Sequence, residues 1–157
     1  MKKILFIGTG GTIASELSGG ALSPAISASR LLEHVPEVSE FCNVDALQLF
    51  ELDSTDITPA HWLRIAAVIT EKYNDYDGFV IAHGTDTMAY TASALSYLVQ
   101  DSARPIVLTG AQRPIGFDTT DSKQNLLDSF ICASSALSGV LVVFGGKVML
   151  GTRVRKT

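Results

Sequence analysis

Apolar residues along the chain gather in short runs that few polar residues interrupt. Four of these runs cover residues 3–7, 79–82, 105–108 and 139–144, and a fifth, more mixed run covers 44–52. Strands that are buried on both faces of a sheet show uninterrupted runs, whereas half-exposed strands alternate between apolar and polar residues. The pattern therefore predicts five strands, most of them in the interior of a sheet.

Between the runs, apolar residues recur at the three-to-four-residue spacing of amphipathic helices. This spacing predicts helices over residues 27–34, 58–73, 88–98 and 123–137. The second helix begins with Thr58-Pro59, a hydroxyl N-cap followed by a proline at the first helical position.

The predicted strands and helices alternate along the chain. Alternation with buried strands indicates an α/β fold, in which a mostly parallel sheet carries helices on both faces in a Rossmann-like three-layer arrangement. Residues 147–157 predict a further extended pair with a turn near Gly151, and hence a short hairpin near the C-terminus.

Composition and charge agree with one folded domain and exclude several classes of partner. The 157 residues are 46% hydrophobic and 18% charged, with a net charge of −4, which argues against disorder. No Lys/Arg cluster precedes the last few residues, so no nucleic-acid partner is expected. No run approaches the roughly 18 apolar residues of a membrane span, so no membrane partner is expected. The apolar run after Met1-Lys2-Lys3 is too short for a secretion signal, which favours a cytoplasmic protein.

The two cysteines offer no metal site. Neither Cys42 nor Cys132 has another cysteine or a histidine at metal-ligand spacing. We therefore expect two buried thiols in a reducing compartment, and no metal.

Four loops follow the predicted strands and are dense in glycines, small hydroxyls and carboxylates. They cover residues 8–12, 53–56, 83–87 and 109–114. Open α/β sheets bind their ligands beyond the carboxyl ends of the strands, so these loops are the candidate site.

The first loop does not match a nucleotide-binding pattern. Counted from Gly8, a dinucleotide fingerprint would need a third glycine or alanine where Ile13 stands, and Asp53 lies roughly 40 residues downstream instead of about 20. No lysine follows the glycines, as a phosphate-binding P-loop requires. A non-catalytic module that binds a nucleotide or another small ligand stays open as an alternative.

The same loops are suited to a hydroxyl nucleophile. Thr12 lies among glycines whose backbone N–H groups could stabilise an oxyanion, but a threonine hydroxyl needs an activating group. Thr85, Asp86 and Lys156 could supply that group, with the carboxylate orienting the ammonium. From spacing alone, ordinary cap and loop roles, with the two hydroxyls bonded to backbone, are the favoured interpretation.

Five segments resemble the N-terminal domain of the bacterial-type L-asparaginases and occur in the order of that family. They read GTGGTIAS, DSTDITP, HGTDTMAYTASAL, LTGAQRP and RVRKT, and the form of the second is closer to the cytoplasmic type I branch. The resemblance implies an amidohydrolase that converts L-asparagine to L-aspartate and ammonia through an acyl-enzyme intermediate, with L-glutamine as an alternative substrate. It implies no cofactor and no metal, and a homo-oligomer, either dimer or tetramer.

The resemblance also implies roles for individual residues. Thr12 would be the nucleophile, although the resemblance leaves open which of the two threonines attacks first. The catalytic set comprises Thr12, Thr85, Asp86 and Lys156. The set that holds the substrate comprises Asp53, Ser54, Thr55, Gly84 and Ala111.

One segment departs from the family pattern. Many relatives carry a tyrosine in a mobile loop soon after the nucleophile, but this chain reads ELSGGALSPA, with Leu22 near the expected place. We assign no catalytic residue there. The Ser18-Gly19-Gly20 run still indicates a flexible lid over the substrate.

The resemblance implies a two-domain subunit, in which residues 1–157 are the N-terminal catalytic domain and a smaller C-terminal domain is absent. Because the family builds its site between subunits, we expect little or no activity from this chain alone. A related amidotransferase subunit, which feeds ammonia to glutamyl-tRNA, is an alternative. It carries an extra N-terminal domain, whereas this chain starts directly at the first strand.

The remaining candidates are expected to be structural. We expect His83 to make structural hydrogen bonds and His34 and His61 to lie at the surface. Trp62 and Phe79 are expected in the core.

Overall fold

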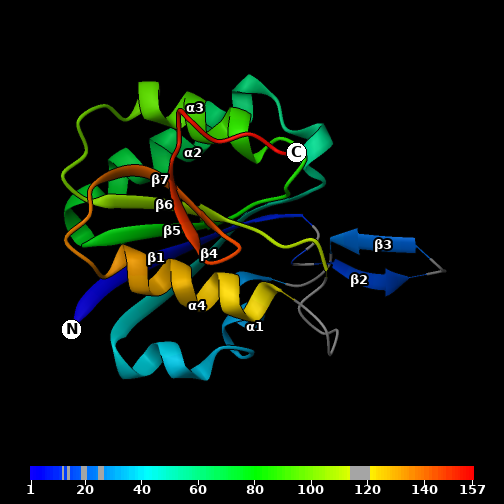
Figure 1. Ribbon diagram of the computed structural model, residues 1–157, viewed down its shortest axis with the longest axis horizontal. Coiled ribbons are helices and arrows are strands. Elements are labelled where there is room, and N and C mark those ends of the chain that lie inside the picture. The colour runs from blue at the N-terminus through cyan, green and yellow to red at the C-terminus, as the bar shows by residue number, and fades with distance from the viewer. Residues whose placement is uncertain (12, 14, 19–20, 25–26, 114–120) are drawn as a thin grey trace.

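The computed structural model describes residues 1–11, 13, 15–18, 21–24, 27–113 and 121–157 (Figure 1). A six-stranded sheet in the order β4-β1-β5-β6-β7-β8 forms its centre. The strands are β1 (Lys2–Gly10), β4 (Cys42–Leu52), β5 (Gly78–Ala82), β6 (Pro105–Thr109), β7 (Gly139–Phe144) and β8 (Lys147–Leu150). All pairings in this sheet are parallel except that of β8 with β7, so the predicted mostly parallel sheet is confirmed.

Helices cover both faces of the sheet, as predicted. Figure 1 shows α2 (Pro59–Lys72) and α3 (Met88–Leu98) on one face, with α1 (Ala28–Leu32) and α4 (Ser122–Ala133) on the other. Short 3-10 helices cover Pro36–Glu40 (η2), Ser54–Asp56 (η3) and Tyr73–Asp75 (η4). None of the helices in the described part of the chain has both the length and the hydropathy needed to span a bilayer.

Two hydrophobic clusters form the core, one on each face, because successive strand residues point in opposite directions. Ile4 and Phe6 of β1 pack with α1 and α4, whereas Leu5 and Ile7 pack with α2 and α3. Phe79 is fully buried, as predicted. Both cysteines are buried free thiols, also as predicted, and burial raises the pKa of each.

Helix α2 begins at Pro59 after Thr58, as predicted, but His61 does not lie freely at the surface. Its imidazole is half-buried, accepts the Thr58 backbone N–H at Nδ1 (2.9 Å), and meets the Phe50 ring edge-on with centroids 4.7 Å apart. His61 therefore lies at the exposed start of α2 but is half-buried there, because its ring completes the N-terminal cap, and His34 is half-buried as well.

Other elements also differ from the prediction: β1 extends to Gly10, and α1 is shorter than predicted, Ala28–Leu32. Helix α4 ends at Ala133 instead of residue 137, because the Ser135 hydroxyl donates to the Cys132 carbonyl (2.6 Å) in competition with the helical backbone. The C-terminal hairpin turns at Gly145 and Gly146, not near Gly151, since both glycines have positive φ angles of 59° and 76°. The segment expected as a lid loop contains an antiparallel pair, β2 (Ser15–Ser18) and β3 (Ala21–Pro24).

Loops at the carboxyl edge of the sheet approach one another so closely that glycine is required. A Cβ on Gly11, whose φ is +85°, would lie 2.5 Å from the Gly84 nitrogen, and a Cβ on Gly84 would lie 2.5 Å from Cβ of Ser54. The Gly11 N–H also donates to the Leu52 carbonyl (3.0 Å). The loops after β1, β4 and β5 are thereby joined into one packed layer.

The two faces of α4 predict different costs of substitution. Phe130 is fully buried with its ring edge-on to Phe6, at 5.3 Å between centroids, whereas its neighbour Ile131 is 52% exposed. Phe130→Ala should lower the free energy of unfolding by about 3–5 kcal/mol because it leaves a cavity. Ile131→Ala, the matched control, should change it by less than about 0.5 kcal/mol. Urea unfolding measures both, and equal losses would contradict the assigned core.

The contact between Gly84 and Ser54 predicts a compensating pair. Gly84→Ala should destabilise the fold by roughly 1–3 kcal/mol, because the new methyl meets the Ser54 side chain. In a Ser54→Gly background the same change should cost clearly less, since the colliding atoms are gone. Gly146→Ala is the control: its Cβ would meet nothing within 4 Å, so its cost should be additive with Ser54→Gly. If urea unfolding shows that the free-energy losses of Gly84→Ala and Ser54→Gly simply add in the double variant, the contact between these two residues is refuted.

Candidate active site

Three of the four predicted catalytic residues form one hydrogen-bonded group. The Lys156 ammonium donates to Oγ1 of Thr85 (3.1 Å) and forms a short ion pair with Oδ1 of Asp86. The partners are 71 and 70 positions apart along the chain. The lysine and aspartate side chains are 40% and 52% exposed, so this pair contributes little to stability. What it provides is a fixed cation beside a hydroxyl.

Different elements deliver the members of this group. Thr85 and Asp86 lie between β5 and α3, at the carboxyl edge of the sheet, and Lys156 lies in the segment after β8. Gly151 anchors that segment: its N–H donates to the Val140 carbonyl (3.0 Å), and its carbonyl accepts from the Ser93 hydroxyl (3.3 Å). These bonds tie the start of the final segment to β7 and α3.

The loop after β4 places Asp53, Ser54 and Thr55. Oδ1 of Asp53 accepts the Thr55 N–H (3.0 Å) and the Thr55 hydroxyl (3.1 Å), which closes the η3 turn. Ser54 is buried, and its carbonyl accepts the Thr87 hydroxyl (2.7 Å). Together with the contact of Ser54 on Gly84, this bond holds the predicted substrate loop against the predicted catalytic loop of residues 83–87.

The loop after β6 contains the buried Ala111 and is held by a residue that the sequence reasoning missed. Asn125 of α4 donates from Nδ2 to the Gly110 carbonyl (2.9 Å) and accepts the Gly145 N–H at Oδ1 (3.1 Å). The carboxylate of Asp121 accepts the N–H groups that follow Ala111. A polar Asn125 beside the core residue Leu126 was the available signal in the sequence.

The predicted nucleophile, Thr12, lies outside the described residues, as do Gly19 and Gly20 of the predicted lid. In sequence it stands between Gly11, which packs against Gly84, and Ile13, which is fully buried. The roles of Thr12 and of the lid stay predictions.

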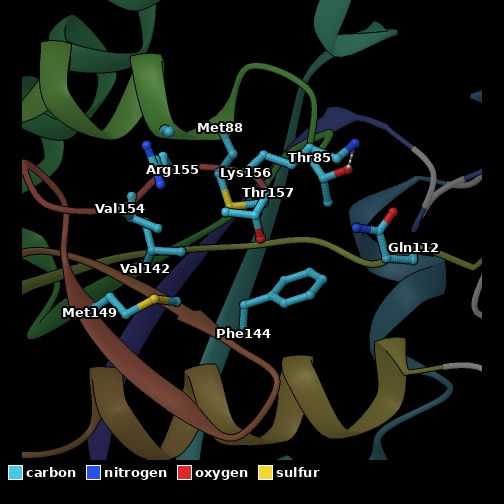
Figure 2. Close-up of a pocket in the computed structure, with 11 residues that line it drawn as sticks. Thr85, Met88, Gln112, Val142, Phe144, Met149, Val154, Arg155, Lys156 and Thr157 are labelled. Atoms are coloured by element: carbon cyan, nitrogen blue, oxygen red, sulfur yellow. Dashed lines mark hydrogen bonds between the residues drawn. The ribbon is translucent and has the colours of Figure 1, made fainter.

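A pocket of about 180 Å³ opens beside the Thr85–Lys156 pair (Figure 2). Thr85, Gln112 and Lys156 are among its polar lining residues, and its apolar wall consists of Met88, Val142, Phe144, Met149 and Val154. The predicted substrate-binding residues do not line it. Within the described ranges, no three metal-ligating side chains gather, and no metal ligand is assigned there.

His83 is fully buried directly before the catalytic loop, and the predicted structural hydrogen bonds are confirmed. Its Nδ1 lies 2.7 Å from the Gly84 carbonyl, and its Nε2 lies 2.9 Å from Oγ1 of Thr91. The Trp62 indole N–H donates to the same hydroxyl (2.9 Å), so Trp62 is half-buried with a polar contact and not purely a core residue. Burial lowers the pKa of His83 below its ordinary value of 6.5, which favours the neutral ring.

The neutral His83 predicts a specific loss of stability in acid. Below about pH 6.5 His83 is protonated in the unfolded chain, whereas its lowered pKa keeps it neutral in the folded chain. Acid therefore lowers the free energy of unfolding. His83→Asn cannot titrate. The stability advantage of the wild type over this variant should therefore narrow by up to about 1.4 kcal/mol between pH 7.5 and 5.5. Urea unfolding at both values measures it, and parallel losses in the two proteins would contradict a neutral buried imidazole.

Comparisons with known proteins assign this chain to a family. The family model described as "Asparaginase, N-terminal" matches residues 3–157. The L-asparaginase of Thermococcus kodakarensis is 40% identical over 155 residues, which cover 98% of this chain and 47% of that protein. Its solved structure superposes with a TM-score of 0.89, covering 96% of this chain and 46% of that one. The structure of L-asparaginase I from Vibrio cholerae superposes with a TM-score of 0.90 at 38% sequence identity, and the match covers 99% of this chain and 48% of that one.

A second kind of relative is equally similar. A glutamyl-tRNA(Gln) amidotransferase subunit of Pyrococcus horikoshii is 41% identical over 163 residues, which cover 98% of this chain and 37% of that protein. The chain thus spans less than half the length of these relatives. The matched model, the identities and the shared sheet lead to one conclusion: the chain belongs to the asparaginase family and carries the fold of its N-terminal domain.

Proposed function

We propose that this chain carries the catalytic threonines of an amidohydrolase that converts L-asparagine to L-aspartate and ammonia. The observation that carries the proposal is the group of Lys156, Thr85 and Asp86 at the carboxyl edge of the sheet. A cation fixed between a hydroxyl and a carboxylate has no evident structural purpose at so exposed a place. It is suited to moving a proton beside a substrate.

The reaction has two steps in this proposal. The Thr12 hydroxyl attacks the side-chain amide carbon, its proton passes to the amide nitrogen, and the C–N bond breaks to release ammonia. Water then hydrolyses the β-aspartyl ester, which frees L-aspartate and restores the Thr12 hydroxyl. We assign Thr85 and Lys156 to the proton relay. Lys156 occupies one lone pair of the Thr85 oxygen, which leaves the hydroxyl proton and the second lone pair for another partner.

The substrate-binding residues would hold the charged end of the amino acid. Asp53 and the second carboxylate oxygen of Asp86 would accept from the α-ammonium group. Ser54 and Gly84, which the packed layer brings together, would donate to the α-carboxylate, and Thr55 would join them by releasing its hydroxyl from Asp53. The Ala111 carbonyl would face the departing amide.

A second candidate function has its own support. The 41% identity to an amidotransferase subunit is as high as the 40% identity to an L-asparaginase. In that case the same residues would release ammonia for use on glutamyl-tRNA. The two functions differ in whether a free amino acid is hydrolysed without tRNA.

We extend the proposal to the whole protein on the same comparisons. The L-asparaginase structures that the chain matches are about twice as long, which supports a role as the N-terminal domain of a two-domain subunit. We propose a cytoplasmic homo-oligomer, in line with the type I form of the DSTDITP segment.

The catalytic assignment predicts graded losses of activity in the complete protein. Thr12→Ala should nearly abolish ammonia release from L-asparagine, and Lys156→Met should lower kcat by about 10²–10⁴-fold, because the proton relay is lost. Lys147→Met is the matched control: Lys147 is exposed on β8, and its loss should leave kcat unchanged. A coupled ammonia assay, with and without glutamyl-tRNA, measures each variant.

Two outcomes would decide against the proposal. Normal turnover in Thr12→Ala would remove Thr12 as nucleophile. Ammonia release that requires glutamyl-tRNA would replace the asparaginase function with that of the amidotransferase.

A further inference from the structure

We propose that His83 is a positioning residue, which sets the orientation of the catalytic loop through the Gly84 carbonyl. The inference rests on the proposed function, because it concerns the loop that presents Thr85 and Asp86 to Lys156. It assigns a role to a buried imidazole that the proposed reaction does not use.

The hydrogen-bond partners define which ring nitrogen of His83 carries the proton. A carbonyl only accepts, so Nδ1 carries the proton and donates to Gly84. The indole N–H of Trp62 only donates, so the Thr91 oxygen accepts there and its hydroxyl proton is free for Nε2. The neutral tautomer with its proton on Nδ1 satisfies all three bonds, and a flipped ring would lose the donor that faces Gly84.

The bond from His83 acts on the next residue through peptide geometry. In a planar trans peptide the C=O and the following N–H point in opposite directions. Holding the Gly84 carbonyl against the buried imidazole therefore turns the Thr85 N–H away from that ring. It also determines the direction in which the chain enters Thr85 and Asp86. A glycine has the widest choice of backbone angles, so an external constraint matters more at Gly84 than elsewhere.

Gly84 is also the place where the neighbouring loops meet. Gly11 and Ser54 pack against it from the loops after β1 and β4, at distances that leave no room for a Cβ. A rotation of the Gly84 peptide would therefore disturb the loop that leads to Thr12 and the loop that carries the substrate-binding residues. His83 thus positions three loops through one carbonyl.

A pair of isosteric substitutions separates positioning from stability. In His83→Asn the side-chain amide can take the place of Nδ1 and donate to Gly84, but it cannot reach Thr91. In His83→Gln the amide can reach Thr91, but no donor faces Gly84. Trp62→Phe is the control, since it removes the indole N–H that donates to the Thr91 hydroxyl and keeps both bonds of His83.

The measurements are kcat and KM for L-asparagine, the free energy of unfolding in urea, and hydrogen exchange of the Thr85 and Asp86 amides, all on the complete protein. We expect His83→Gln to lower kcat about tenfold to a hundredfold, as loss of orientation does, and to speed amide exchange in the loop. His83→Asn and Trp62→Phe should stay within about threefold of the wild type in kcat. If kcat in the Asn and Gln variants falls equally, or only in proportion to lost stability, the positioning role is refuted.

The exchange measurement keeps this inference separate from the proposed function. If the wild type hydrolyses neither asparagine nor glutamine, the proposed function fails. The role of His83 is then judged on hydrogen exchange alone. Faster exchange of the Thr85 and Asp86 amides in His83→Gln than in His83→Asn supports the positioning role, and equal exchange overturns it. Should either variant fail to fold, Thr91→Ser and Thr91→Val replace the pair. The serine keeps the hydroxyl that orients the ring and should behave as wild type, whereas the valine should loosen the loop.

Discussion

The site depends on backbone-to-backbone packing of loops at the carboxyl edge of the sheet. Gly11 lies against Gly84, and Gly84 lies against Ser54, each too close for a Cβ. Parallel strands bring the ends of β4, β1 and β5 to one edge, but only glycines let the loops that follow them touch. The Thr87 hydroxyl on the Ser54 carbonyl fastens the same layer. The residues predicted to bind substrate and those predicted to be catalytic therefore share one packed layer of loops.

Buried polar side chains also hold the loops at this edge of the sheet. His83, Asn125 and Thr109 are buried, and each bonds to a backbone carbonyl near or beyond the carboxyl end of a strand. Such groups are costly when unpaired, so each bond strongly favours one loop conformation over its alternatives. The proposed catalytic group, by contrast, is partly exposed and leaves Lys156 accessible to a ligand.

Much of the fold followed from the sequence because burial produces simple patterns. The apolar runs at 79–82 and 105–108 and the Thr58-Pro59 cap indicated correct elements. The resemblance to the asparaginases, more than the spacing, indicated that Thr85 and Asp86 would meet Lys156. What failed was decided by side-chain competition or turn chemistry, as when Ser135 ends α4 and the two glycines turn the hairpin. Asn125 escaped notice because its partners, Gly110 and Gly145, are distant in sequence. Thr12 stays a prediction.

The position of Lys156 after β8 has a consequence for biosynthesis. A ribosome delivers the chain from its N-terminus, and domains fold as their parts emerge. Every strand of the central sheet precedes Lys156, so the sheet can assemble while Thr85 and Asp86 still lack their cation. Within residues 1–157 the proposed catalytic group therefore closes after the sheet, so a nascent chain holds the scaffold of this domain before it holds the proposed proton relay.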